Sequence, residues 1–233
     1  MHCDIEKIKQ RIETVKEKNN AFVILNGDIM NNATKTSVSD SYAEEIPPME
    51  QLERFVSLFE PVKEKTLAVT SGNHENRTYI KEGIDLTAVA CKQLGIEDKY
   101  SKTGALVFVK FGQGIKHEGE RVSKMLYTIY CTHGSGGGRK EGAKAIRLAD
   151  MASIVDADCY IHSHTHLSMI MKEGFFRVDR LNGTVNKVDK LFVNTSAMLE
   201  YGGYGEAFEY KPSSTDCPVI YLYSKQRRME AKL

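Results

Sequence analysis

Several short apolar segments of this sequence are each followed at once by polar side chains that can bind a metal ion. These side chains are Asp28, Asn73, His74, His133, His164 and His166. α/β proteins place functional groups at the ends of buried strands, because the strands are rigid and the loops after them are free to vary. The positions therefore predict one functional site, formed where four strands end.

Carboxylate, amide and imidazole groups make a mixed oxygen and nitrogen donor set. Such a set suits Mn, Fe, Zn or Ni better than Ca. An aspartate such as Asp28 has two oxygens and can bridge two cations. The spacing of His164 and His166 places both imidazoles on the same side of an extended segment. No cysteine belongs to the set, which argues against a structural zinc site.

Four motifs resemble those of the metallophosphoesterase superfamily, the calcineurin-like phosphoesterases. They are GDIMNN around Asp28, GNHEN around Asn73, THG around His133, and SHTH around His164 and His166. The family pattern is Asp-x-His, Gly-Asp, Gly-Asn-His-[Glu/Asp], a lone His and Gly-His-x-His, each at a strand end. The resemblance implies an α/β fold (α+β in some schemes). The expected architecture is a four-layer αββα sandwich with two packed mixed β-sheets, as a single domain over residues 1–233.

The resemblance also implies a role for each matched ligand. Asp28 would bridge two divalent metal ions, of which Mn is the expected kind and Fe, Zn or Ni the alternatives. Asn73, His133 and His164 would complete one metal site. His166 would bind the other metal ion.

His74 has a different implied role, because the family does not use it as a metal ligand. It would face the scissile phosphate, stabilise the developing charge and protonate the leaving oxygen. The implied reaction is hydrolysis of a phosphodiester or phosphomonoester, in which a metal-bound hydroxide attacks phosphorus in line. The substrate is a phosphate ester whose identity the sequence does not reveal.

The sequence departs from the family pattern at two places. Ser163 stands where the family usually has glycine, and a serine disfavours the positive φ that glycine permits. The Asp-x-His motif, which ends the family's first strand, has no counterpart upstream of Asp28. We therefore expect the first strand to be missing, the edge of a neighbouring strand to be exposed, and only Asp28 and His166 to remain for one metal ion.

Three explanations fit the absent motif. The chain is an incomplete version of a gene product that starts upstream, which we favour because every other motif is intact. Alternatively, the protein has lost full dinuclear chemistry, or a partner chain fills the gap in an oligomer. The alternative function is therefore a catalytically impaired module that binds metal or a phosphorylated ligand without efficient turnover.

A glycine-rich loop follows His133 and ends in Arg139 and Lys140. It lacks the spacing of a phosphate-binding Walker A motif. Glycines beside a ligand let the backbone approach a phosphate closely, and the two basic residues are candidates for contacting it. A solvent-exposed loop with ordinary charges explains the same residues equally well.

Composition limits the classes of partner. The chain has 233 residues, with 32 Lys and Arg against 31 Asp and Glu, and its net charge is +1. This balance gives no overall positive potential that would attract nucleic acid or a membrane surface. A local basic patch would still allow a nucleic-acid substrate and a nuclease activity. No apolar run approaches the ~20 residues of a membrane helix. Five scattered cysteines without a Cys-x-x-Cys pair favour a reducing cytoplasm.

The elements that must position these residues follow from hydrophobic periodicity and from the placement of Gly and Pro. Helices are expected over 4–19, from Pro47 and Pro48 to near Pro61, over 79–94 and over 143–155, the last with Ile146, Ala149, Ile154 and Val155 as its apolar face. Buried strands are expected over 21–25, 66–70 and 159–162, with a hairpin or meander from 105–111 and 125–132. The remainder is expected to be rich in β-structure.

Overall fold

The computed structural model describes residues 3–35, 37, 44–112, 125–136, 138, 140–199, 209, 211–212 and 214–233. Its α-helices are α1 (Ile5–Glu17), α2 (Pro48–Phe59), α3 (Asn73–Glu82), α4 (Leu86–Leu94) and α5 (Glu141–Asp150). Its strands are β1 (Val23–Asn26), β2 (Thr66–Thr70), β3 (Tyr100–Ser101), β4 (Ala105–Phe111), β5 (Met125–Thr132), β6 (Cys159–His162), β7 (Met169–Asp179), β8 (Thr184–Asn194), β9 (Val219–Leu222) and β10 (Met229–Lys232). Short 3₁₀ helices span Glu60–Lys65, Glu97–Lys99 and Met151–Ser153.

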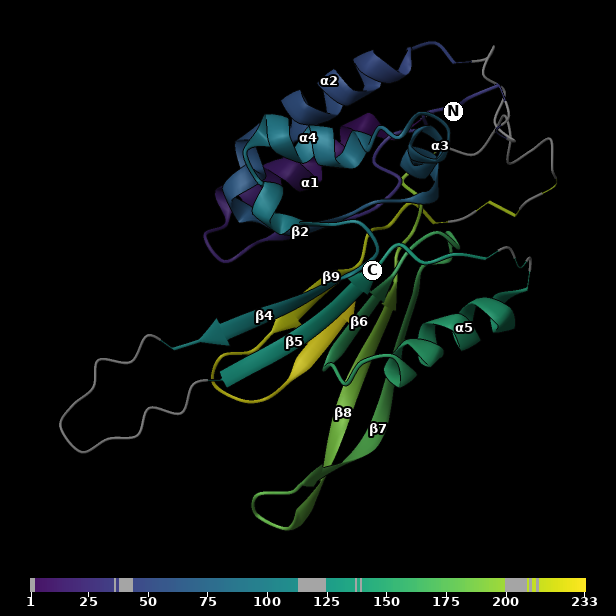
Figure 1. Ribbon diagram of the computed structural model, residues 1–233. Helices are drawn as coiled ribbons and strands as arrows, with labels where there is room; N and C mark the ends of the chain where they lie inside the picture. The colour runs from purple at the N-terminus through teal and green to yellow at the C-terminus, as the bar shows by residue number, and fades with distance from the viewer. Residues whose placement is uncertain are drawn as a thin grey trace.

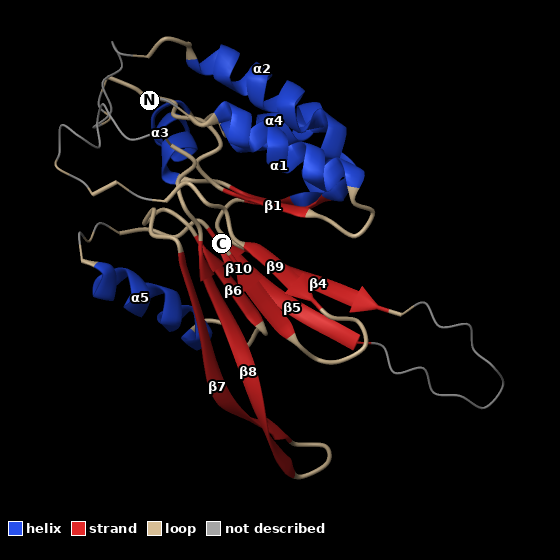
Figure 2. Cartoon of the chain, turned by 180° about the vertical axis from the view of Figure 1, so that it is seen from behind, coloured by secondary structure: helices blue, strands red, loops and turns tan. Residues whose placement is uncertain are grey.

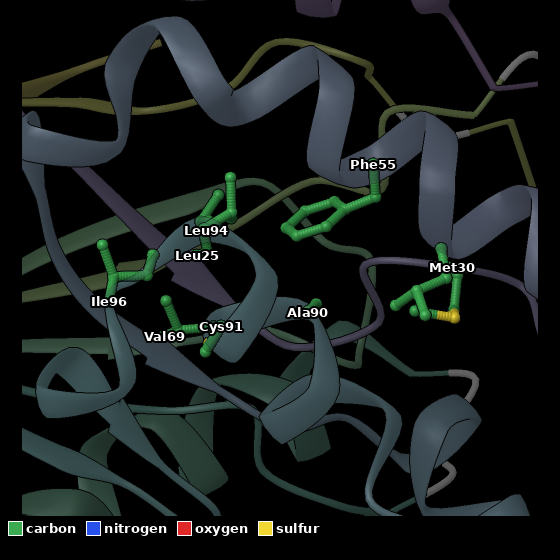
Figure 3. Packing of buried hydrophobic residues seen from close by; sticks show 9 residues of the cluster. Leu25, Met30, Phe55, Val69, Ala90, Cys91, Leu94 and Ile96 are labelled. Carbon is green, nitrogen blue, oxygen red and sulfur yellow. The ribbon is translucent and has the colours of Figure 1, made fainter.

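The first sheet has the strand order β1-β2-β3 and is parallel throughout. Helices α1, α2 and α4 lie on its outer face (Figure 1). Phe55 of α2 and Leu94 of α4 pack there against Leu25 of β1 and Val69 of β2 (Figure 3). Within the described residues β1 is an edge strand, paired only with β2.

The second sheet has the order β4-β5-β6-β8-β7 and is mixed. Strands β5, β6 and β8 run parallel, while β4 and β7 pair antiparallel with their neighbours. Ala68 of β2 shares a buried core with Ile129 of β5 and Ile161 of β6, so the two sheets pack face to face. The antiparallel pair β9–β10 joins this core through Met229.

Helix α5 covers the outer face of the second sheet, as Figures 1 and 2 show. Leu148 packs there with Tyr160 and Phe192, whose rings stack at 4.8 Å. The layers are therefore helix, sheet, sheet and helix, which confirms the expected α/β sandwich. The five-stranded sheet is mixed as expected, whereas the three-stranded one is parallel.

Two expectations about the helices were wrong. The segment 79–94 is not one helix, because Gly83 adopts a left-handed conformation (φ 69°) that ends α3. Asp85 then caps α4 by accepting a hydrogen bond from the backbone N–H of Ala88. In α5 the buried residue is Leu148, while Ile146 is exposed to solvent.

None of the helices in the described parts of the chain is both long and apolar enough to span a membrane.

Candidate metal centre

Four strand ends bring the candidate ligands to one place. Asp28 follows β1, Asn73 opens α3 after β2, His133 follows β5, and His164 follows β6. Because β1 and β2 run parallel, and so do β5 and β6, the carboxyl ends of each pair lie at one edge of their sheet. Figure 2 shows the ends of the second sheet just below α3.

The donor atoms of these four side chains face one another. Asn73 Oδ1 lies 2.8 Å from His164 Nδ1 and 3.0 Å from His133 Nε2. Asp28 Oδ2 lies 3.2 Å from the same His133 Nε2. Ligand atoms of Asp28, His133 and His164 all lie within 4.8 Å of one another. Two oxygens and two nitrogens in such proximity fit a divalent transition-metal ion.

His74 and His166 lie beside this cluster. His74 Nε2 is 3.7 Å from Asp28 Oδ2, and its backbone N–H donates a 3.0 Å hydrogen bond to Asp28 Oδ1. His166 is exposed, and it lies within electrostatic range of Asp28 and of the other site histidines. It does not belong to the set of residues whose ligand atoms lie within 4.8 Å of one another.

The expected geometry of the His-x-His pair was wrong. His164 and His166 both adopt positive φ, at 57° and 54°, so the segment does not have the extended backbone that the spacing argument assumed. Asp28 has a positive φ of 50° as well. Such strain in non-glycine residues persists where the surroundings enforce it, and it is concentrated at functional sites.

The charge of Asp28 dominates the electrostatics of the cluster. Burial raises the pKa of its carboxyl, but the hydrogen bond with His133 and the nearby imidazoles outweigh burial and lower the pKa to about 2. Burial lowers the pKa of both His74 and His164. For His133 burial is overcome by the Asp28 carboxylate, and the pKa is raised. Asp28 is therefore ionised at neutral pH.

His133 is oriented by the backbone of β1. Its Nδ1 lies 2.9 Å from the carbonyl oxygen of Asn26, and that oxygen can only accept, so Nδ1 carries the proton of this bond. The other nitrogen, Nε2, points at Asp28 and Asn73. Fixing the tautomer through the far nitrogen is the usual way a protein prepares a histidine to bind metal.

The side chain of Asn26, the last residue of β1, forms hydrogen bonds with residues at the ends of β2, β5 and β6. Its Nδ2 donates to the carbonyl of Thr132 at 2.8 Å and to Ser163 Oγ at 2.7 Å, while its Oδ1 accepts from Thr70 at 3.0 Å. Ser163 also accepts a hydrogen bond from Thr195. Ser163 is not among the residues with positive φ, so the expected conflict with glycine does not arise. Its hydroxyl makes contacts that glycine cannot make.

Glu75 is a buried residue of the site that the sequence analysis did not single out. It is 1% exposed, and its carboxylate accepts hydrogen bonds from the backbone N–H groups of Asp28 (3.1 Å), Met30 (3.1 Å) and Gly72 (2.8 Å). Burial and the charge of Asp28 raise its pKa to about 7. The GNHEN motif was the available signal, since it places a carboxylate two residues after Asn73.

Glu75→Gln is expected to weaken Mn²⁺ binding by about 10- to 100-fold, because the loop that aims Asp28 loses an acceptor for one of its N–H groups. Isothermal titration calorimetry measures the affinity. Glu82→Gln, at the exposed end of the same helix, is the matched control and should bind like the unchanged chain. Equal affinities for both variants would show that Glu75 does not support the cluster.

Gly72 is close to Asp28. A Cβ at this position would overlap the Asp28 carboxylate and its backbone nitrogen. Gly72→Ala is therefore expected to lower the free energy of unfolding by about 1–3 kcal/mol and to weaken Mn²⁺ binding. Chemical denaturation gives the first quantity. The control is Gly142→Ala, where a Cβ meets nothing within 4 Å. It should leave Mn²⁺ binding unchanged and the stability unchanged or improved. A similar loss of stability in Gly142→Ala would refute the explanation by steric overlap at Gly72.

The two candidate substrate-binding residues receive no such support. Arg139 lies outside the described residues. Lys140 is exposed at the residue that precedes α5. His162, the last residue of β6, is buried, and its Nδ1 lies 2.9 Å from Asn194 Oδ1, a contact that fits a structural role.

Comparison with models of protein families matches residues 1–168 to the calcineurin-like phosphoesterases. A search of curated proteins and a search of solved structures each returned no match. The family match covers more than half of the 233 residues and contains all six predicted metal and catalytic residues. The chain therefore belongs to the calcineurin-like phosphoesterase family.

Proposed function

We propose that this chain hydrolyses phosphate esters, either phosphodiesters or phosphomonoesters, with two divalent metal ions, preferably Mn²⁺. Family membership supports metal-dependent phosphoester hydrolysis in general. The observation that carries the proposal for this chain is the meeting of the Asp28, Asn73, His133 and His164 donor atoms at one point.

These four residues would hold one cation, and Asp28 with His166 would contribute to the second. When bound, the two cations supply an activated water as nucleophile and neutralise the charge of the phosphate. The low pKa of Asp28 keeps its carboxylate available at neutral pH. The hydrogen bond between His133 and Asn26 keeps Nε2 directed at the same point.

His74 would act on the substrate rather than on a cation. Its backbone N–H holds Asp28, and its ring lies at the edge of the cluster, 3.7 Å from the carboxylate. From there it can donate a proton to the leaving oxygen and stabilise charge on the phosphate. Arg139 and Lys140 remain proposed contacts of the substrate phosphate.

A second candidate function is binding without efficient turnover. It is favoured by the position of His166 outside the tight cluster. In the part of the chain that the structure describes, the second cation would have only Asp28 and His166 as ligands from our predicted set. Such a module would bind one metal ion and a phosphorylated ligand.

Hydrolysis of an aryl phosphodiester and an aryl phosphomonoester by the full chain distinguishes the two functions. We expect product formation that requires added Mn²⁺, stops with a chelator and is lost in His164→Ala. If the chain binds Mn²⁺ and inorganic phosphate by calorimetry but releases no product above His164→Ala, the binding function holds and the enzymatic proposal fails.

We further propose that residues 1–233 form one domain that works in the cytoplasm. The five cysteines all lie in the described parts of the chain and form no disulfide there, in agreement with a reducing compartment. A nucleic-acid substrate stays open, without support from the net charge of +1.

A further inference from the structure

Strand β7 forms an edge of the five-stranded sheet and is eleven residues long. Its inner edge pairs with β8 from Met169 to Asp179. Among the residues that the structure describes, no strand pairs with its outer edge. The far half of the β7–β8 hairpin extends beyond the neighbouring strands (Figure 1). A long, uncovered edge strand is a template for pairing with another chain.

Large apolar side chains cover one face of this far half. Phe176 is 79% exposed and Val178 is 62% exposed, and Val185 lies opposite Val178 on β8. Alternate residues of a strand share a face, so Phe176 and Val178 lie on the same face as Lys172. Lys172 lies in the half of β7 farther from the hairpin turn, and it donates a hydrogen bond to the carbonyl of Met229 in β10. The exposed apolar residues therefore continue a face that β10 covers elsewhere.

The charges of β7 are ordered so that the strand complements itself. If two copies pair antiparallel about a two-fold axis at Phe175, each Glu173 lies opposite Arg177 of the other copy. The same alignment places Gly174 opposite Phe176, so that the aromatic ring covers the backbone. Opposite charges at directly facing positions stabilise a strand pair, and like charges destabilise it.

The alignments one or two residues to either side lack this complementarity. Centring the axis on Glu173 would set two glutamates face to face, and centring it on Arg177 would set two arginines face to face. An axis at Phe176 would place Glu173 of one copy opposite Asp179 of the other, which are like charges. An axis at Gly174 forms no ion pair. Arg177 already contacts Asp156 and Asp158, but a guanidinium has five donors, so it can accept another carboxylate partner.

We propose that two copies of this chain associate through their β7 strands, antiparallel and centred on Phe175, to form one continuous sheet. The contact is isologous, as a two-fold dimer requires. It buries Phe176 and Val178 beside the strand pair. The proposal does not depend on hydrolysis, because it rests on the hairpin and not on the metal cluster.

Sedimentation velocity of the full chain, over about 1–100 µM, tests this proposal. We expect a dimer at high concentration that dissociates on dilution. Glu173→Lys creates two like-charge contacts and should raise the dissociation constant at least about 10-fold. Glu53→Lys makes the same charge change at an exposed position of α2 and should dimerise like the unchanged chain.

Hydrogen exchange provides the second measurement. Amides of residues 169–179 should be more protected at high than at low concentration, and Glu173→Lys should remove the difference while keeping the protection of β5 and β6. A chain that stays monomeric throughout, or a dimer that Glu173→Lys leaves unchanged, would overturn the proposal. Glu173 also lies opposite Lys190 of β8 within the same chain, so the retained protection of β5 and β6 is the check that Glu173→Lys still folds.

Discussion

His74→Ala is expected to lower the kcat for hydrolysis of an aryl phosphodiester by about 100- to 10,000-fold, while the affinity for Mn²⁺ stays within about threefold. The reason is the position of the ring, which lies beside the cluster of donors and 3.7 Å from the Asp28 carboxylate. Its loss removes a proton donor and leaves Asn73, His133 and His164 in place. Steady-state kinetics and calorimetry measure the two effects separately.

A second substitution separates proton donation from simple hydrogen bonding. His74→Asn keeps a polar side chain with an N–H group, but that amide cannot give up its proton to a leaving oxygen. We expect it to be nearly as slow as His74→Ala. If His74→Asn retained most of the activity, the role would be hydrogen bonding alone. If either variant lost Mn²⁺ binding as well, His74 would belong among the ligands.

Asp28→Asn is expected to weaken Mn²⁺ binding by more than about 100-fold and to reduce hydrolysis to background. The substitution removes the carboxylate that is ionised at neutral pH. It also puts an amide in place of the carboxylate that now faces His133 Nε2 and accepts a hydrogen bond from the backbone N–H of His74. Electron paramagnetic resonance of Mn²⁺ in a titration measures the free and bound ion.

The control for Asp28→Asn is Asp98→Asn, which removes an exposed carboxylate that forms a surface ion pair with Lys99. That variant should bind Mn²⁺ and turn over substrate normally. Retention of tight Mn²⁺ binding by Asp28→Asn would contradict the assignment of Asp28 as the central ligand of the proposed centre.

The meeting of Asp28, Asn73, His133 and His164 was predictable from the sequence for a topological reason. Each follows a short apolar strand, and parallel strands end at a common edge. The sequence predicted β2 to the residue, because its apolar run is bounded by clear polar and glycine positions. The apolar runs in the sequence and the geometry of parallel sheets therefore both predicted that these side chains meet at the carboxyl ends of the strands.

The position of His166 was not predictable in this way. The argument from His-x-His spacing assumes an extended backbone, and the structure places both histidines at positive φ. The residue before His164 is tied to β1 by a contact distant in sequence, the hydrogen bond that Asn26 donates to Ser163. Backbone strain imposed by tertiary contacts leaves no periodic signal in a sequence.

Glu75 was missed for a related reason. A glutamate early in a helix is ordinarily read as a solvated residue near the helix N-terminus. Its burial becomes evident only when the loop after β1 lies against α3 and offers the N–H groups of Asp28 and Met30. In α5 the sequence analysis chose the wrong apolar face of the helix. Several apolar residues could form that face, and the packing of Leu148 against Tyr160 and Phe192 determines which one is buried.

Anomalous scattering at the manganese edge from crystals of the full chain soaked in Mn²⁺ tests the central claim most directly. We predict a peak between Asp28 Oδ2, Asn73 Oδ1, His133 Nε2 and His164 Nδ1, with these four atoms as ligands. A peak bound by other residues, or no peak at this point when Mn²⁺ supports hydrolysis in solution, would contradict the proposed centre.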